Sequence, residues 1–388
     1  MDNIEEILTK GVVNIIPGKE QLEKKLRTGK KLNVYFGIDP TAVKIHLGNA
    51  VALRKIHAIS NLNHNVTFLI GDFTALIGDA SDKESERPIL TREQIQANFK
   101  TYKKQAEKII DFSKIKIRYN SEWLKKLTFE EIVKLAQHFS IGDFIGRELI
   151  KKRLSEGTKV RLDETLYPVM QGYDSYFMDT DIQVGGADQT FNMQAGRTLQ
   201  KDLRGKESFV LVTGYLEGTD GRKMSKSWGN AIWLEDTPEE MFGKVMSIND
   251  NLIGQYLELA TNLPLSEIQT EKKALQKGEN PISVKRRLAQ QIVKELHGKV
   301  EAQLASDHFD RTFRKGSPQY KKEVSFQPIL LRTVALASGA SISQAKRLIT
   351  QGSVDVDGQT ITNSNYKIQG GEELKIGKRI FVKVKDVK

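Results

Sequence analysis

The sequence predicts an α/β fold: a parallel sheet covered by helices, followed by an all-helical region and a small α+β region. Three observations carry this prediction. Short apolar runs alternate with helical patterns over residues 32–212. From residue 238 to about 304 the pattern is wholly helical, and residues 327–388 return to short helices and strands. Strands that alternate with helices are typical of a parallel sheet buried on both faces.

The first region alternates regularly between the two kinds of element. Its strands are expected at residues 32–38, 66–70, 115–119, 181–184 and 209–212. Its helices are expected at residues 47–62, 92–111, 128–138, 143–155, 163–178 and 188–201. Sheets of this kind bind ligands beyond the carboxyl ends of their strands. Two polar motifs directly follow strands and therefore belong at this edge.

The rest of the chain divides where its composition changes. Residues 311–325 are polar and charged and contain Gly316 and Pro318, which indicates a linker. Beyond it we expect helices at 329–337 and 343–350, a hairpin at 353–361 around Asp357-Gly358, and strands within 373–385. The predicted domains are a sheet domain at 1–229, a helical domain at 230–310, a linker at 311–326 and a terminal domain at 327–388.

Charge is distributed unevenly along the chain. There are 60 Lys and Arg against 49 Asp and Glu, a net charge of +11. Residues 327–388 contain ten of the basic and five of the acidic residues, so this end alone carries +5. A basic surface is compatible with many soluble proteins, but its concentration at one end favours an RNA-binding module.

The absence of cysteine narrows the chemistry. A chain without Cys forms no disulfide, thiolate nucleophile or Cys-ligated zinc site, and it fits a reducing compartment. No apolar run approaches the ~20 residues that a membrane span requires. The first ten residues contain acids and lack the apolar core of a secretory signal. We therefore predict a cytoplasmic protein with no membrane partner.

The tetrad His46-Leu47-Gly48-Asn49 opens the helix expected at 47–62. Backbone N–H groups and the dipole at a helix N-terminus attract phosphate, and Gly48 lets a nucleotide approach the backbone closely. His46 can donate a hydrogen bond to a phosphate oxygen. Taken alone, His46 could instead be an ordinary helix cap, and Asp39-Pro40-Thr41 could be only a turn.

A second motif lies about 180 residues downstream. Gly218 and Gly221 give the segment 218–227 freedom to move, and Lys223 and Lys226 place two positive charges three residues apart. Such charges can surround departing pyrophosphate. A lone Lys-x-x-Lys would indicate an exposed basic turn, but its pairing with the first motif indicates a site that holds ATP from two sides.

A third group of polar residues lies between these motifs. On a helix, Tyr167, Gln171 and Asp174 fall at positions i, i+4 and i+7 and share one face. They could form an ordinary polar surface. The strand that follows ends in Gly185-Gly186-Ala187-Asp188-Gln189, which adds an acid and an amide.

The first two motifs resemble the HIGH and KMSKS signatures of class I aminoacyl-tRNA synthetases, with Asn49 in place of the usual final histidine. The third group is similar to tyrosyl-tRNA synthetases, as are segments 35–42 and 77–87. Residues 341–358 resemble the S4-like RNA-binding domain of many bacterial and organellar members. The resemblance implies a Rossmann-like catalytic domain that binds tyrosine and ATP.

The residues that the resemblance assigns to these ligands fall into three sets. For tyrosine they are Tyr35 and Asp174 on the phenol, Asp79, Tyr167 and Gln171 on the ammonium group, and Gln189 near the carboxylate. For ATP they are Gly37, Asp39, His46, Gly48, Asn49, Gly186, Asp188, Lys223 and Lys226. The catalytic residues around the phosphates are Thr41, His46, Lys223 and Lys226, with Lys83 and Arg87 on a neighbouring loop.

The implied reaction joins L-tyrosine to tRNA(Tyr) through a tyrosyl-adenylate, with ATP and Mg²⁺ entering together as substrate. The sequence offers no carboxylate cage, so we predict no protein-bound metal. For tRNA we predict contacts from the run Lys151-Lys152-Arg153, which could also be a solvated helix face, and from Lys346 and Arg347. The resemblance also implies a homodimer joined through the catalytic domain.

Three other interpretations fit parts of the sequence. A tryptophanyl enzyme would share the chemistry but lacks the S4-like tail, and Tyr35 with Asp174 argues against it. A non-catalytic RNA-binding protein with a synthetase fold would not need intact Lys223 and Lys226. A nucleotidyltransferase of the same superfamily would have little use for the helical region and the tail.

Overall fold

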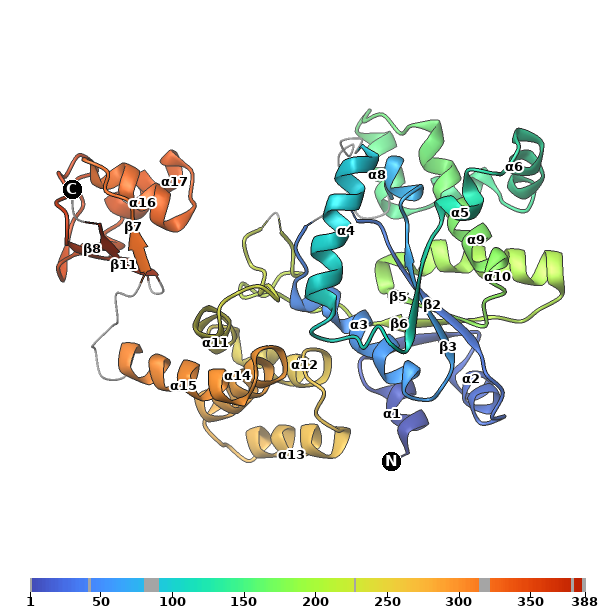
Figure 1. Ribbon diagram of the computed structural model, residues 1–388, viewed down its shortest axis with the longest axis horizontal. Helices are drawn as coiled ribbons and strands as arrows, with labels where there is room; N and C mark the ends of the chain where they lie inside the picture. Colours follow the sequence, from blue (N-terminus) through green and yellow to red (C-terminus); the bar gives the residue numbers. More distant parts are fainter. Residues whose placement is uncertain are drawn as a thin grey trace. The chain divides into compact units, whose positions relative to one another are not determined.

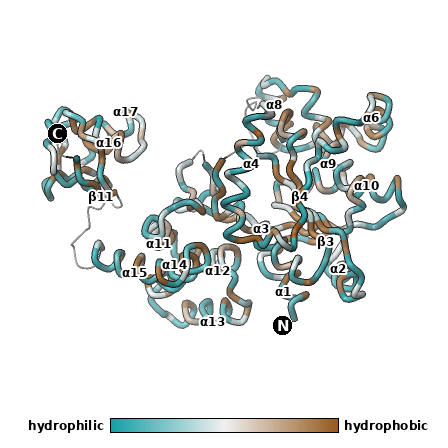
Figure 2. The backbone as a smooth tube through the Cα atoms, in the orientation of Figure 1, coloured by the Kyte–Doolittle hydropathy of each residue, from teal (hydrophilic) through white to brown (hydrophobic). Residues whose placement is uncertain are grey.

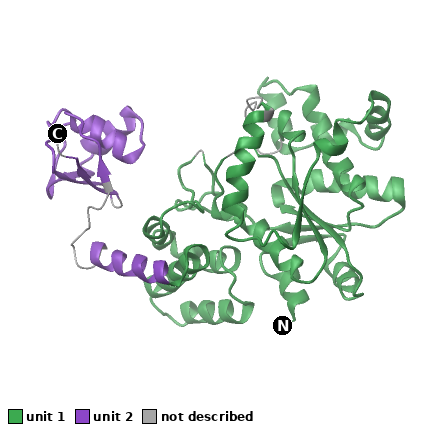
Figure 3. Ribbon diagram, viewed as in Figure 1, with its two compact units in different colours: residues 1–299 green, residues 300–388 purple. Residues whose placement is uncertain are grey.

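The computed structural model describes residues 2–40, 43–79, 91–226, 228–313, 322–377 and 380–385. The chain forms two compact units, residues 1–299 and residues 300–388 (Figure 3). The domain boundaries that the sequence suggests at 229 and 310 stay predictions.

A six-stranded sheet forms the centre of the first unit (Figure 1). Its strands are β1 (Val12–Ile16), β2 (Asn33–Ile38), β3 (Asn65–Ile70), β4 (Ile115–Tyr119), β5 (Ile182–Gly186) and β6 (Phe209–Thr213). They lie in the order β1-β6-β5-β2-β3-β4, all parallel except β1, which pairs antiparallel with β6. The predicted α/β class is confirmed. β1 was not predicted, although its residues Val12–Ile16 form a short β-branched run; only Ile15 of them is buried.

The strand order reverses direction between β2 and β5. The chain runs from β2 through α3 (Leu47–Ser60) to β3 on one side, and from β5 through α10 (Thr190–Arg204) to β6 on the other. Because crossovers between parallel strands are right-handed, the two helices cover opposite faces of the sheet. A crevice therefore forms at the carboxyl ends of β2 and β5, where such sheets bind ligands.

Burial on both faces explains why the inner strands are apolar along most of their length, as the brown colour around β3 in Figure 2 illustrates. Every residue of β6 is buried. The helix α9 (Tyr167–Phe177) packs on α10, and a Cβ at Gly172 would lie 3.1 Å from the carbonyl oxygen of Ala195. This close approach fixes the helix that carries the third predicted polar group.

The other helices of the sheet region are α1 (Asn3–Thr9), α2 (Lys19–Leu26), α4 (Arg92–Ala106), α5 (Ser121–Leu124), α6 (Phe129–Ala136), α7 (Ile141–Ile145) and α8 (Glu148–Ser155). The helix predicted at 143–155 is divided in two, because α7 ends at Gly146 and Arg147 takes extended backbone before α8 begins. Glycine loses more conformational freedom in a helix than any other residue, which favours a break there.

Residues 238–297 contain helices and turns only, as predicted. The helices are α11 (Pro238–Met246), α12 (Ile253–Leu259), α13 (Leu265–Gln276) and α14 (Pro281–His297), and α15 (Lys299–Phe313) follows. Pro238 and Pro281 stand at the first helical position, where the missing N–H of proline is harmless. In the described ranges of the chain, no helix is both long and apolar enough to cross a membrane.

The second unit contains a small sheet beside α16 (Leu330–Ser338) and α17 (Ile342–Thr350). Its strands are β7 (Lys322–Val324), β8 (Val354–Val356), β9 (Gln359–Thr360), β10 (Glu373–Ile376) and β11 (Ile380–Val384), in the order β7-β11-β10-β8-β9. Asp357 and Gly358 have φ angles of 46° and 80°, as a two-residue hairpin turn requires. β7 falls inside the predicted linker, where its polar sequence concealed a strand that pairs in parallel with β11.

Candidate functional site

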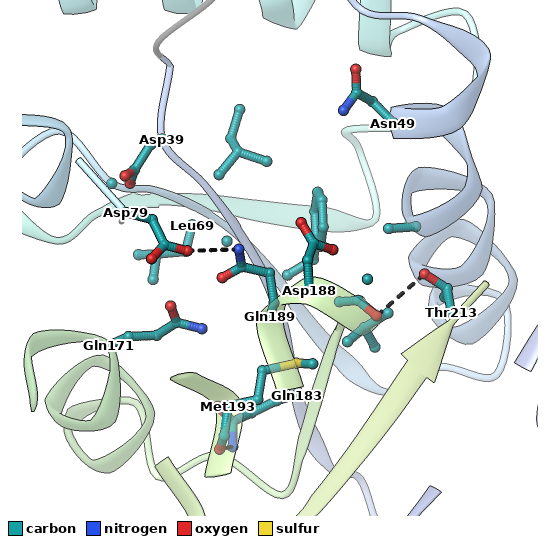
Figure 4. A pocket seen from close by; sticks show the side chains of 18 of the residues that line it. Asp39, Asn49, Leu69, Asp79, Gln171, Gln183, Asp188, Gln189, Met193 and Thr213 are labelled. Carbon is teal, nitrogen blue, oxygen red and sulfur yellow. Dashed lines mark hydrogen bonds between the residues drawn. The ribbon is translucent and has the colours of Figure 1, made fainter. Parts of the chain in front are cut away.

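A cavity of about 320 Å³ opens at the ends of β2 and β5 (Figure 4). The predicted residues that line it are Tyr35, Gly37, Asp39, His46, Gly48, Asn49, Asp79, Tyr167, Gln171, Asp174, Gly186, Asp188, Gln189 and Lys223. Lys226 is exposed and does not line the cavity. Thr41, Lys83 and Arg87 lie outside the described residues. The fold thus gathers segments far apart in the sequence around one space.

At one end of the cavity, Asp174 is almost fully buried, with 3% of its surface exposed. Trp123 donates its indole N–H to Oδ1 at 2.7 Å, and Asn120 donates its amide N–H to Oδ2 at 3.2 Å. Burial raises the pKa of Asp174 to about 8; the two hydrogen bonds oppose the rise, and the charges of Asp39 and Asp72 add to it. A buried carboxyl group held by fixed donors is suited to accept a further hydrogen bond from a ligand.

Tyr35, on β2, reaches the same end of the cavity. Its hydroxyl donates to the amide oxygen of Gln183 at 3.0 Å. Burial raises the pKa of Tyr35 well above its ordinary value, the nearby Asp174 adds to the rise, and a hydrogen bond with Gln171 opposes it. Residues from β2, β5 and α9 therefore converge on one buried polar end.

Asp39, just beyond β2, anchors a second polar group. It accepts hydrogen bonds from the Thr74 hydroxyl at 2.7 Å and from the Tyr167 hydroxyl at 2.9 Å. Thr74 Oγ1 also accepts from the amide of Asn120 at 3.0 Å, so a chain of hydrogen bonds runs from Asp39 to the buried end. A Cβ at position 71 would lie 2.1 Å from Asp39 Oδ1, so Gly71 leaves the room that this hydrogen-bonded carboxylate occupies.

Asp79 adds a buried carboxylate to the cavity wall. Gln189 and Asn192 donate their amide N–H groups to its Oδ2 at 2.9 and 3.0 Å. Figure 4 shows Asp79, Gln189 and Gln171 around the same space. A carboxylate flanked by amides is suited to hold an ammonium group, since a buried cation needs both a counter-charge and hydrogen-bond acceptors.

His46 is the N-cap residue of α3. Its Nδ1 accepts from the Asn49 backbone N–H at 3.2 Å, and Asn49 Oδ1 accepts from the His46 backbone N–H at 3.3 Å. Burial, and then the charge of Lys223, lower the pKa of His46 to about 4, so the ring is neutral at pH 7 and carries its proton on Nε2. His46 therefore offers an N–H donor beside a helix N-terminus, and the side chain of Asn49 serves the cap.

The glycine-flanked lysine loop, residues 218–226, is folded around Asn230. The Asn230 amide donates to Asp220 Oδ1 at 2.7 Å and to the carbonyl oxygen of Lys223 at 3.2 Å. The Lys223 ammonium lies 3.7 Å from Asp188 Oδ2 across the cavity. Because both side chains of this ion pair are partly exposed, the pair is weak and Lys223 can turn toward a ligand.

Two family models match the chain. Residues 27–314 match the tRNA synthetases of class I (W and Y), and residues 330–374 match the S4 domain. The chain belongs to this class I tRNA synthetase family. The predictions of the family, the enzyme class and the S4-like tail are thereby confirmed.

Curated relatives align with nearly the whole synthetase. A tyrosine–tRNA ligase of Carboxydothermus hydrogenoformans is 43% identical over 397 residues, covering 98% of this chain and 97% of the relative. A tyrosine–tRNA ligase of Thermotoga maritima is 40% identical over 387 residues, covering 98% and 96%. Among solved structures, a C-terminally truncated mitochondrial tyrosyl-tRNA synthetase of Aspergillus nidulans shares the fold with a TM-score of 0.66 at 23% identity, over 80% of this chain and 94% of that one.

The tRNA-binding residues that the sequence suggests lie on two helices. Lys151 and Lys152 are exposed on α8, and Lys346 and Arg347 are exposed on α17. Arg153 differs from its neighbours: it is buried and donates to both carboxylate oxygens of Glu164, at 2.7 and 3.1 Å. The prediction that Arg153 contacts tRNA is therefore wrong. The helical turn directs this side chain inward, to Glu164, while Lys151 and Lys152 face solvent.

Four residues of the site were not predicted from the sequence: Thr74, Asn120, Trp123 and Gln183. Asn120 follows β4 as Asp39 follows β2, so a polar residue at a strand end was a usable signal. Gln183 was also detectable, as a polar side chain inside a buried strand. Thr74 and Trp123 carry no such signal, because an isolated threonine or tryptophan is ordinary in a loop or a core.

Proposed function

We propose that this synthetase attaches L-tyrosine to tRNA(Tyr) through a tyrosyl-adenylate and releases AMP and pyrophosphate. The observation that carries the proposal is the buried Asp174 carboxyl group beside the Tyr35 hydroxyl. A phenol satisfies this end of the cavity, whereas phenylalanine leaves buried polar groups without a partner. The curated tyrosine–tRNA ligases, at 40 and 43% identity across the chain, support the same substrate.

Tyrosine lies along the cavity with its phenol at Asp174 and Tyr35. Its ammonium group is held by Asp79, Tyr167 and Gln171. The carboxylate lies near Gln189 and so faces the part of the cavity that ATP enters. This pose is supported by the lining residues, which supply acids at both polar ends of the amino acid.

In the first step the tyrosine carboxylate attacks the α-phosphorus of ATP in line, and the bond to pyrophosphate breaks. The nucleophile belongs to the substrate, so the protein supplies positioning and charge stabilisation. His46 donates its Nε2–H to a phosphate oxygen, and Lys223 and Lys226 neutralise the departing pyrophosphate. Asp188 holds the ribose, which it can do once Lys223 has left it.

Mg²⁺ enters with ATP as part of the substrate. Over the ranges that the structure describes, no group of three His, Cys, Asp or Glu side chains is placed to hold a metal ion. The chemistry the ion supplies is neutralisation of phosphate charge. The roles of Thr41, Lys83 and Arg87 around the phosphates stay predictions, because these residues lie outside the described ranges.

In the second step a hydroxyl group of the terminal ribose of tRNA attacks the tyrosyl carbonyl carbon, and AMP leaves. Lys151 and Lys152 contact the acceptor arm, and Lys346 and Arg347 contact a second part of the tRNA. Their exposure supports these roles, since phosphate contacts need accessible cations.

The homodimer and the cytoplasmic location complete the proposal. Large apolar side chains on α6, α7 and the turn before α9 support an interface on the catalytic domain: Phe129 is 81% exposed, Ile141 58% and Leu162 80%. Large apolar side chains left exposed on one domain support an association surface there. Sedimentation equilibrium tests the dimer; a monomer at micromolar concentration contradicts it.

ATP–pyrophosphate exchange with each of the twenty amino acids tests the substrate. We expect exchange with tyrosine and not with phenylalanine. Exchange with tryptophan in place of tyrosine would instead favour the other branch of the family. Exchange with no amino acid would favour a non-catalytic role, because the first step needs no tRNA in this proposal.

A further inference from the structure

The hydrogen bonds at the Asp174 end of the cavity have a fixed direction. The amide nitrogen of Gln183 donates to the carbonyl oxygen of Met193 at 2.8 Å. A backbone carbonyl can only accept, so the Gln183 amide must turn its oxygen toward Tyr35. The Tyr35 hydroxyl donates to that oxygen at 3.0 Å. Its proton therefore points away from the ligand.

Gln183 has no room to reverse this arrangement. Only 1% of its surface is exposed. Gly196 on α10 passes so close that a Cβ there would lie 2.6 Å from the Gln183 amide oxygen and 2.7 Å from the nitrogen. Figure 4 shows Gln183 next to Met193 on the same side of the cavity. The fold, and not the ligand, thus sets the direction of the Tyr35 hydroxyl.

Asp174, like Tyr35, faces the ligand as a hydrogen-bond acceptor. Trp123 and Asn120 both aim N–H groups at its carboxylate. The Asn120 amide also donates to Thr74, so the same nitrogen is engaged twice within the protein. With the Tyr35 proton directed to Gln183, the Tyr35 oxygen, which also bonds Gln171, and the Asp174 carboxylate present acceptors to the cavity.

We propose that Gln183 is a specificity-determining residue that acts through Tyr35: it makes this end of the pocket accept hydrogen bonds, so that the synthetase selects an amino acid whose para substituent donates one. The inference rests on the proposed function and extends it. Substrate selection then depends on the direction of the Tyr35–Gln183 hydrogen bond and not only on the presence of Tyr35 and Asp174. Gln183 touches none of the reacting atoms and is a positioning residue.

Two tyrosine analogues of similar size test this direction. The para amino group of 4-aminophenylalanine donates hydrogen bonds, whereas the fluorine of 4-fluorophenylalanine can only accept. Dissociation constants are measured by equilibrium dialysis at about pH 8.5, where most of the Asp174 carboxyl group is ionised. The wild-type protein should bind the amino compound more tightly.

In Gln183→Met the side chain keeps its length but loses the amide, so the Tyr35 proton is free to turn to the ligand. The preference for the amino over the fluoro compound should fall by about 3–10-fold, the effect of one neutral hydrogen bond. Gln183→Glu retains an oxygen for Tyr35, and its second oxygen, protonated, can donate to the Met193 carbonyl, so this variant should keep a preference close to wild type. A preference that falls in Gln183→Met and persists in Gln183→Glu excludes a general loss of packing.

Tyr35→Phe is the matched control, since it leaves no hydroxyl to direct. Adding Gln183→Met to it should leave the preference unchanged. An equal loss of affinity for both analogues, or the same change of preference without the hydroxyl, would overturn the proposal. Pyrophosphate exchange by the wild-type protein with tyrosine distinguishes a failure of the proposed function from a failure of the role of Gln183. Its absence contradicts the proposed function and this inference, whereas exchange with an unaltered preference in Gln183→Met contradicts only the role of Gln183.

Discussion

Asp174→Asn provides the sharpest test of the tyrosine site. The carboxylate accepts from Trp123 at Oδ1 and from Asn120 at Oδ2. An asparagine can keep its oxygen toward Trp123, but its NH₂ group then faces the NH₂ group of Asn120. Asparagine also lacks the negative charge of the carboxylate that accepts a hydrogen bond from the phenol. A hydrogen bond to a charged group contributes about 1.5–3 kcal/mol, so the affinity for tyrosine should fall about 10–150-fold.

Phenylalanine has no such hydrogen bond to lose, so its affinity should change little. Equilibrium dialysis gives the dissociation constants of both amino acids, and the preference for tyrosine over phenylalanine should fall by about 10–150-fold. Asp202→Asn is a matched control, because this partly exposed carboxylate lies on α10 and pairs with His138. If Asp174→Asn weakened both amino acids by one factor, Asp174 would be a packing residue and the assignment of the phenol site would fail.

The pH dependence of wild-type binding follows from the same group. Burial raises the pKa of Asp174 to about 8, so below that pH the empty site holds a proton that the phenol must displace. The affinity for tyrosine should therefore rise as pH increases, by up to about tenfold per pH unit, and level off near pH 8. Equilibrium dialysis between pH 6 and 8 should show no such rise for Asp174→Asn or for phenylalanine.

Three further predictions concern the loop, the tail and the buried ion pair. Lys226→Ala should slow adenylate formation by about 10²–10³-fold with tyrosine affinity nearly unchanged, because the ammonium acts on charge that develops in the transition state; single-turnover kinetics that show equal losses in binding and rate would contradict this. Deleting residues 327–388 should abolish tRNA charging and spare pyrophosphate exchange, and charging that survives at physiological salt would give the tail another role. Glu164→Ala leaves the buried Arg153 without its carboxylate partner and should lower the free energy of unfolding, measured in urea, by about 3–5 kcal/mol. As a control, Lys151→Ala on the exposed face of α8 should change this free energy by less than about 0.5 kcal/mol.

Most of the fold was predictable, because the signals that specify it are local. The inner strands β2, β3, β5 and β6 are recognisable as apolar runs because most of their residues are buried, and the edge strand β4 is recognisable by alternation of apolar and charged residues. The edge strand β1 was overlooked although four of its five residues are Val or Ile, and the short β7, Lys-Glu-Val, carried no such signal. Each is held by pairing with a strand distant in the sequence, β6 and β11, and neither needs a continuous apolar run to pair.

The candidate site divides along the same line. Some site residues can be recognised from their spacing in the sequence, such as His46 with Gly48 or Tyr167 with Asp174, because helix and turn geometry fix their relative positions. The hydrogen-bond partners of Asp174 could not be predicted from the sequence, because Trp123 and Asn120 reach it from the end of another strand. Spacing alone does not reveal which neighbours a side chain will have.

By itself, the sequence determined the alternation of elements, the nucleotide-binding motifs and the class of chemistry, because backbone geometry and local spacing set these. The tertiary structure alone decided that Arg153 is buried against Glu164, that the pKa of Asp174 is raised, and that the Tyr35 proton points to Gln183. Each of these depends on burial and on the direction of a hydrogen bond between segments far apart in the chain. Charge and proton position in a pocket are properties of the packed assembly of elements and not of any one of them.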